Sequence, residues 1–320
     1  MSWPSNYPDE PDDQPRKTSA PPPRPGGILK DFAVGFKLAA TNFLSYALAM
    51  LGVIFVTIIL LVIIVLLIVI PLLLTIGLPA LIQIAIAIET TFTEATHLTL
   101  VTLILILVVP ILGPFFIAVG SLFGMSREVV ESDGTRAESA FSWYGKKALS
   151  LVGGGLIHFL VTLAPLIVAF IGIAYPTWNP PSNEDLRIII PLVVVWIILI
   201  NGMLSLTFPG IIDGLSAVRA AARSVRLTCQ FPARVLGAWF IIVLIAGVPL
   251  LSLINGLAFL WDPIIPSELL EPYAGLIIIA LVFYVIPAIS IVLTRIYMIL
   301  TARVDETYTL DSSEAGGDRL

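Results

Sequence analysis

An uncharged apolar run limits what this chain can fold into. Residues 44–88 contain no charged side chain, and LSYALAMLGVIFVTIILLVIIVLLIVIPLLL (44–74) exceeds the roughly 20 apolar residues that cross a bilayer as a helix. Because the hydrocarbon core offers no water to backbone N–H and C=O groups, a helix is the expected structure. The whole chain has the same character, with 12% charged residues and a mean hydropathy of +1.01. We therefore predict an all-α, polytopic membrane protein.

Six segments of the chain are apolar enough to span a membrane. We place them near residues 44–70, 98–123, 148–174, 188–212, 235–260 and 274–300. With six spans and cytoplasmic termini, sixteen of the seventeen Lys and Arg residues lie inside, which the positive-inside rule favours, and Arg187 is the exception. A seventh span within 44–88 would move the loop at 127–147 outside. Residues 80–92 are then expected along the outer interface, with re-entry into the membrane as the alternative.

The two ends of the chain differ from this apolar part. Residues 1–27 hold eight prolines and few aliphatic side chains, which predicts a disordered, Pro-rich cytoplasmic tail. Residues 303–320 are expected to form an acidic, disordered cytoplasmic tail, which leaves 28–302 as the transmembrane domain. No apolar core of a signal peptide precedes residue 43, so we expect the cell (cytoplasmic) membrane as the location.

Short amphipathic segments precede three of the spans. In DGLSAVRAAARSVRLTCQFPAR (213–234), Arg219, Arg223 and Arg226 fall within about 40° of one another on a helix. An apolar stripe adjoins them: Leu215, Val218, Ala222, Val225 and Cys229. This pattern predicts a helix in the cytoplasmic interface whose arginines contact lipid phosphates. We expect the same of 29–43 and of 141–147, where Lys146 and Lys147 follow interfacial aromatic residues.

A short sequence repeat relates these segments. DGxxAxxA occurs at Asp133 and at Asp213, 80 residues apart. We interpret the chain as three two-helix repeats, each consisting of a cytoplasmic interfacial amphipathic helix, an outward span and a returning span, all in one orientation. Both aspartates are expected to cap the helices that follow them. A catalytic role is less favoured, since neither has a His, Cys or second carboxylate at a useful spacing.

Few polar groups lie within the predicted spans, namely His158, Asn201 and Asn255. Ionisable groups in a membrane often mark a pathway, but a neutral imidazole that joins helices is the favoured interpretation of His158. Arg295 is expected to extend to the inner headgroups. The glycines at 120–124 and 153–155 predict that the second and third spans pack closely, because small residues let backbones approach.

The sequence contains no motif that predicts an enzyme. Phosphate-binding Gly-rich loops, HExxH and GxSxG are absent. Glu94 and His97 have the spacing of half a metal site, but no second pair completes it. We therefore predict no catalytic, cofactor-binding or metal-binding residues and no cofactor. A net charge of −5 without a basic face argues against nucleic acid, which leaves membrane lipids as partners, with a protein partner or self-association open.

Two inner loops carry a family resemblance. GMSREVVESDGTRAESAF (124–141) and FPGIIDGLSAVRAAARSVRLT (208–228) resemble the inner loops of a six-helix integral membrane protein family of unknown function, frequent in archaea. That family is similar to the membrane domain attached to some glycerophosphodiester phosphodiesterases. The resemblance covers residues 28–302 and implies the six-helix layout and the cytoplasmic membrane. It does not imply phosphodiesterase activity, because the soluble catalytic barrel of those enzymes has no counterpart here.

Two functions fit these observations. The first is a non-enzymatic, membrane-organising or scaffold protein that contacts anionic lipid through Arg219, Arg223, Arg226, Lys146 and Lys147. The second is a permease or channel-like transporter of a neutral or amphiphilic solute, with a polar cavity lined by His158, Asn201 and Asn255. We favour the first, because transport usually requires more polar groups within the spans. A cavity that contains all three polar side chains would reverse this preference.

Overall fold

The computed structural model describes residues 26–94, 97–132, 134–174, 183–247, 249 and 267–317. These residues form helices and no strands, which confirms the all-α prediction. In chain order the elements are α1 (Ile28–Thr41), α2 (Phe43–Glu94), α3 (His97–Ser132), α4 (Ala137–Lys146), α5 (Ala148–Ala174), α6 (Asn183–Leu204), α7 (Thr207–Ile212), α8 (Ala217–Gln230), α9 (Pro232–Ile242), the π-helical turn η1 (Val243–Gly247), α12 (Ser267–Ala280), the π-helical turn η2 (Leu281–Val285) and α13 (Ile286–Gly317).

Several described helices are apolar enough to cross a membrane. Three qualify alone: Phe43–Pro71, Pro191–Ile212 and Ala274–Val304. Two bent helix pairs raise the number to five if each pair is one span. Ala137–Lys146 lies at 80° to Ala148–Leu163, and Ala217–Gln230 lies at 106° to Pro232–Gly247. These helices indicate a membrane protein. The sixth span and the three-repeat arrangement stay predictions.

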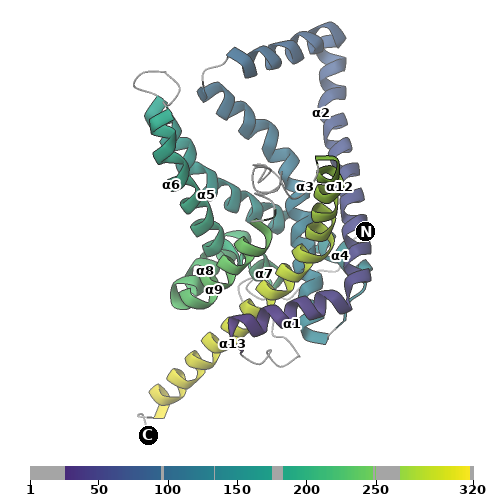
Figure 1. Ribbon diagram of the computed structural model, residues 1–320. Coiled ribbons are helices and arrows are strands. Elements are labelled where there is room, and N and C mark those ends of the chain that lie inside the picture. Colours follow the sequence, from purple (N-terminus) through teal and green to yellow (C-terminus); the bar gives the residue numbers. More distant parts are fainter. Residues whose placement is uncertain are drawn as a thin grey trace, which may run out of the picture.

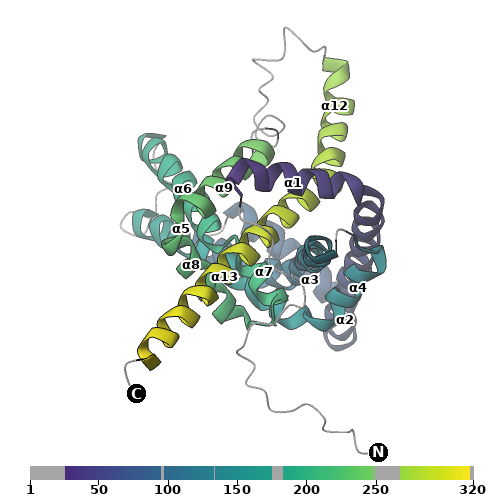
Figure 2. The same ribbon diagram turned by 90° about the horizontal axis from the view of Figure 1, so that it is seen from below.

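The short helices gather at one end of the molecule, which we call the base. Figure 1 shows α2, α3, α5 and α6 extending from this end, where α1, α4, α7, α8 and α9 lie. Seen from below in Figure 2, α1 crosses α13. Gly35 allows this crossing, because a Cβ there would overlap Val292 of α13. The three predicted amphipathic segments are therefore separate helices, α1, α4 and α8, each followed by a longer or bent helix.

The buried core lies at the base. Leu151, Leu206, Ile211 and Ile296 belong to one cluster there and are fully buried. Farther along α2 the apolar side chains are uncovered, and Leu74, for example, is 80% exposed. An exposed apolar surface of this kind is compatible with insertion into a bilayer.

Close packing between α3 and α5 confirms the prediction drawn from their glycines. Gly120 of α3 lies against Leu151 of α5, and Gly155 of α5 lies against Phe116 of α3. A Cβ atom at either glycine would overlap its neighbour, so the absence of a side chain lets the helices approach. Gly124 differs, because it faces Trp143 of α4.

Two chain segments bear on the predicted boundaries. Within α2, Gly77 leaves the helical conformation with φ = 78°, a value that favours glycine, so the long apolar run is broken where Pro71 and Pro79 flank it. At the C-terminus the structure differs from the predicted disordered tail (303–320), because α13 continues as a helix to Gly317. The predicted N-terminal tail lies outside the described residues except for Gly26 and Gly27.

Candidate functional site: an arginine-lined pocket at the base

Helix α8 is set between two sharp turns. Before it, Gly214 takes φ = 112°, which reverses the chain after α7 at a value that side chains rarely allow. After it, Pro232 starts α9 and the chain bends by 106°. Proline suits the first turn of a helix because it lacks the N–H that would remain unbonded there. These local features orient α8 across the direction of the helix that follows.

One face of α8 is bonded to the end of α6. Ser224 Oγ donates to the carbonyl of Met203 at 2.7 Å and accepts from the N–H of Leu206 at 3.1 Å. Thr228 Oγ1 donates to the carbonyl of Ser224 within α8 at 2.9 Å and lies 3.3 Å from the carbonyl of Met203. These bonds satisfy backbone groups that the end of α6 leaves without helical partners. The sequence pattern predicted an arginine face and an apolar stripe on α8, but not this hydrogen-bonded face. Helix α8 is therefore packed against the base as well as amphipathic.

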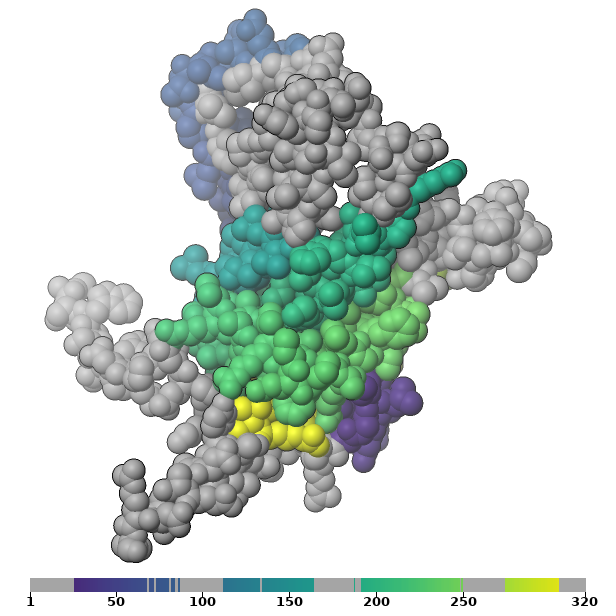
Figure 3. All heavy atoms as spheres, turned by 90° about the vertical axis from the view of Figure 1, so that its left-hand side faces the viewer, coloured from purple at the N-terminus to yellow at the C-terminus, as the bar shows by residue number. Residues whose placement is uncertain are grey.

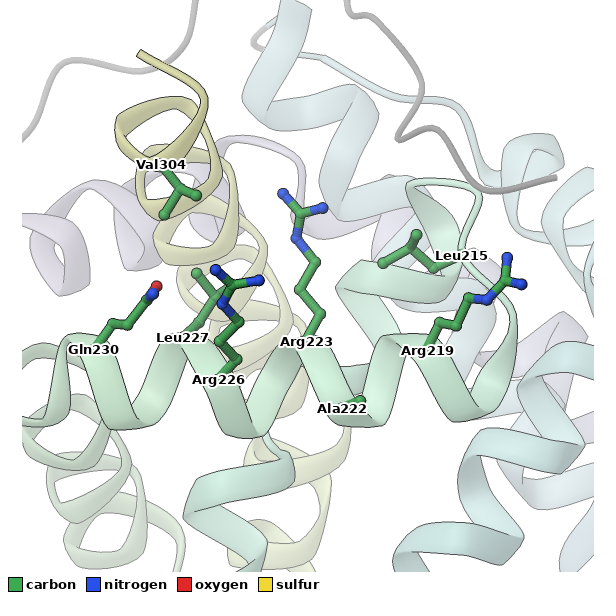
Figure 4. Close-up of a pocket in the computed structure, with 8 residues that line it drawn as sticks. All are labelled: Leu215, Arg219, Ala222, Arg223, Arg226, Leu227, Gln230 and Val304. Atoms are coloured by element: carbon green, nitrogen blue, oxygen red, sulfur yellow. The ribbon is translucent and has the colours of Figure 1, made fainter. Parts of the chain in front are cut away.

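The arginines of α8 line a pocket, as Figure 4 shows. Arg219, Arg223 and Arg226 extend from one side of the helix. The cavity has a volume of about 340 Å³, and its lining is Leu215, Arg219, Ala222, Arg223, Arg226, Leu227, Gln230 and Val304. Val304 belongs to α13, so the pocket lies between α8 and α13. In Figure 3, residues of α8 and α9 (green) form the surface beside α13 (yellow) and α1 (purple). The predicted grouping of the three arginines is confirmed.

A buried ion pair lies close to this pocket. Arg127 Nη1 of α3 donates to Asp213 Oδ1 at 2.5 Å, and the two side chains are 6% and 7% exposed. Tyr297 of α13 donates to the other Asp213 oxygen at 3.2 Å, and Glu131 accepts from Arg127 Nε at 2.9 Å. The predicted capping role of Asp213 is therefore wrong: Ser216 is the N-cap residue of α8, and the carboxylate binds arginine instead. Asp133 lies outside the described residues.

The protonation of this pair reflects burial and charge together. Burial raises the pKa of the Asp213 carboxyl, while Arg127, the Tyr297 hydroxyl and Arg223 oppose that rise. Burial alone would lower the pKa of Arg127, but Asp213 and Glu131 outweigh it and the pKa is raised, so Arg127 stays charged. Arg223 thus acts electrostatically on Asp213, which couples the pocket to the ion pair.

A second charged cluster fastens α1 to the base. Asp31 is fully buried and accepts from Arg234 of α9 at 2.5 Å and from Arg295 of α13 at 3.1 Å. The prediction that Arg295 extends to headgroups is wrong, since its guanidinium Nε binds this carboxylate. Sequence reasoning missed Asp31. The available signal was its position on the same helical face as Phe32, Gly35 and Ala39, all buried in α1.

The polar side chains of the transporter hypothesis are partly brought together. His158 Nε2 of α5 and Asn201 Oδ1 of α6 lie 2.6 Å apart, and Asn201 Nδ2 donates to the carbonyl of Ile197 at 2.7 Å. Asn255 lies outside the described residues. A second, apolar groove of about 500 Å³ lies between α6 and α9, and neither it nor the arginine pocket includes His158 or Asn201. The pair therefore joins two helices, as the favoured interpretation predicts.

The other predicted lipid-contact residues, Lys146 and Lys147, do not line the arginine pocket. Lys146 ends α4, with its Nζ 6.0 Å from the centre of the Trp143 ring, and Lys147 follows in the turn before α5. Among the described residues, no group of three His, Cys, Asp or Glu side chains is placed to hold a metal ion. The side chains of Glu94 and His97 lie outside the described part.

Comparison with known proteins adds no assignment. No family model, curated protein or solved structure matches this chain. The resemblance to the six-helix membrane family therefore stays a prediction.

Proposed function

We propose that this protein is a non-enzymatic, membrane-organising scaffold whose base contacts anionic lipid through the arginines of α8. In this proposal the chain crosses the cytoplasmic membrane six times, in three two-helix repeats, with both termini inside. The observation that carries the proposal is that Arg219, Arg223 and Arg226 of α8 line one pocket. Helix α8 lies at 106° to the segment Pro232–Gly247 that follows it.

The bend between α8 and α9 supports an orientation of α8 along the membrane surface. If α9 crosses the bilayer, a helix at 106° to it lies nearly along the membrane surface, where arginines reach phosphates. Val218 is 69% exposed, and Ala222 and Cys229 are also exposed, so part of the predicted apolar stripe is available to lipid. In the same proposal, the 80° bend between α4 and α5 supports a comparable position for Lys146 and Lys147.

Lipid retention tests the proposal. Each arginine near an anionic surface contributes about 1 kcal/mol, so three contribute roughly a hundredfold in affinity. We expect native mass spectrometry of the full chain to show preferential retention of phosphatidylglycerol over phosphatidylcholine. Replacing Arg219, Arg223 and Arg226 by Gln should remove that preference. A matched control replaces Arg16, Lys17 and Arg24, which removes the same charge from the N-terminal stretch. Equal losses in both variants would refute a specific role for α8.

A second candidate function rests on the pairing of His158 with Asn201. A permease or channel-like transporter of a neutral or amphiphilic solute would use this polar pair within the predicted spans. A reproducible small-molecule adduct that is lost in His158→Ala or Asn201→Ala, and kept in the α8 variant, would favour transport over the scaffold.

A further inference from the structure

Helix α1 joins several helices along the edge of the base. Its carboxylate Asp31 accepts from Arg234 of α9 and from Arg295 of α13. One turn later, the backbone of Gly35 lies against Val292 of α13. Figure 2 shows α1 running along the edge of the base from α9, across α13, toward α2. A change in the docking of α1 therefore acts on more than one of the long helices.

Helix α13 is preceded by an interruption that lies near α1. The N–H of Ile286 bonds to the carbonyl of Leu281, five residues earlier, as in a π-helical turn. Pro287 follows and has no N–H to give to the helix. Helices bend at π-helical turns and at prolines. The candidate span Ala274–Val304 thus contains a hinge at 281–287.

The two sides of this hinge are packed differently. Before it, Leu276 and Ile279 of α12 are 67% and 56% exposed. After it, Ile291 and Val292 of α13 are fully buried in the base. A helix held by few packed side chains moves more readily than one held on all sides. Bending at the hinge therefore moves α12 against a fixed α13.

Tyr284 connects the hinge to α1. Its hydroxyl donates to the carbonyl of Phe36 at 3.3 Å. The two aromatic rings also meet edge to face, with their centres 5.7 Å apart. Since Phe36 belongs to α1, the position of α1 determines where the side chain of Tyr284 is held.

The outer face of α1 carries two lysines. Lys30 and Lys37 are exposed and lie two turns apart on one side of the helix. Within the described part of the chain, neither lysine has an ion pair. Asp31 does not offset their charge, because it is fully buried and binds two arginines. This face is complementary to an anionic membrane surface, near which each lysine strengthens binding about fivefold.

We propose that α1 responds to the charge of the membrane surface and sets the bend of the span Ala274–Val304 at the hinge. Anionic headgroups bind Lys30 and Lys37 best when α1 is an ordered helix with both lysines on one side. They therefore stabilise the docked state of α1 over an undocked one, and Tyr284 transmits docking to the hinge. The inference rests on the proposed function for the cytoplasmic position of the base, but it uses α1 and not the arginines of α8.

Hydrogen exchange in lipid nanodiscs tests this coupling. The full chain is compared in phosphatidylcholine alone and in phosphatidylcholine with phosphatidylglycerol, and amide exchange is followed by mass spectrometry in α1 and at 281–287. We expect phosphatidylglycerol to slow exchange in α1 by up to about 30-fold, the combined effect of two lysines, and to slow exchange at 281–287 with it. Lys30→Gln combined with Lys37→Gln should remove both effects. Equal exchange at 281–287 in the two lipids would overturn the inference.

A matched control removes the same charge elsewhere. Arg136 and Arg187 are exposed and lie outside α1, so Arg136→Gln combined with Arg187→Gln should leave the lipid response unchanged. Both double variants change exposed side chains only and should keep the unfolding midpoint of the unmodified chain in phosphatidylcholine. A lipid response that is lost equally in both would refute a specific role for α1.

Tyr284→Phe tests the transmission to the hinge. It removes one hydroxyl and keeps the ring against Phe36, so α1 should still respond to phosphatidylglycerol. Exchange at 281–287 should become about fivefold faster, the effect of one hydrogen bond, and should no longer follow the lipid. A lipid response at 281–287 that survives in this variant would contradict the coupling. If the Gln variant of the three α8 arginines keeps its preference for phosphatidylglycerol, the proposed function fails, whereas a missing response of α1 and the hinge refutes only this inference.

Discussion

Replacing Asp213 by Asn isolates the buried ion pair at the base. The substitution keeps the size of the side chain and an oxygen that can accept a hydrogen bond, but it removes the charge opposite Arg127. Both side chains are almost fully covered, at 6% and 7% exposure. Arg127 would then hold a buried positive charge whose remaining ionic partner is Glu131, which is 29% exposed.

The expected loss can be estimated from this geometry. Removing one partner of a buried pair usually costs about 3–5 kcal/mol. Because Glu131 still pairs with Arg127 at 2.9 Å, we expect the lower end, about 3 kcal/mol of the free energy of unfolding. That is a large part of the total stability of about 5–15 kcal/mol that is typical of a folded protein.

Equilibrium unfolding in one detergent, followed by circular dichroism, measures this loss. Glu131→Gln is the matched control, since it removes the other carboxylate on the same arginine; as a partly exposed i,i+4 pair it should cost about 0.5 kcal/mol or less. Adding Arg127→Met to Asp213→Asn should recover part of the loss, because no unpaired buried charge remains. If Asp213→Asn costs no more than Glu131→Gln, the ion pair does not stabilise the base as we argue.

Three further predictions address the rest of the molecule. Asp31→Asn removes the charge that holds two arginines, so amide hydrogen exchange in α1 should accelerate; exchange that stays slow would show that packing alone holds α1. Gly124→Ala puts a methyl group into the Trp143 ring and should lower the free energy of unfolding by about 1–3 kcal/mol, whereas Gly134→Ala, with nothing within 4 Å, should be neutral. Cys229 is exposed and should react with a membrane-impermeant maleimide from the cytoplasmic side; labelling from outside intact cells would contradict the six-span topology.

Local patterns were sufficient to predict the short amphipathic helices of the base, but not the helical continuation of α13 to Gly317. The segments predicted at 29–43 and 141–147 correspond to α1 (Ile28–Thr41) and α4 (Ala137–Lys146). Helical periodicity is a property of neighbouring residues, so it can be read without knowing the tertiary structure. The packing of α3 on α5 was predictable for a related reason, since bare glycine surfaces indicate close approach even when the partner side chain is unknown.

The ion pairs were not predictable, because their partners are distant in the chain. Asp213 lies 86 residues from Arg127, and Asp31 lies 264 residues from Arg295. A local pattern offers two nearer interpretations for such residues, a helix cap for the aspartate and a lipid headgroup for the arginine. Tertiary contacts override both here. A buried carboxylate requires a partner more strongly than a helix N-terminus requires a cap, because an unpaired buried charge costs several kcal/mol and a missing cap costs about 1 kcal/mol.

The same ion pairs bear on the proposed site. In a chain with 12% charged residues, the described base places Asp31 and Asp213 in bonds to arginines that do not line the pocket. These carboxylates therefore stabilise the packing of α1, α3, α9 and α13. Positive charge at the base is thus divided between arginines that hold the fold and arginines that line a cavity.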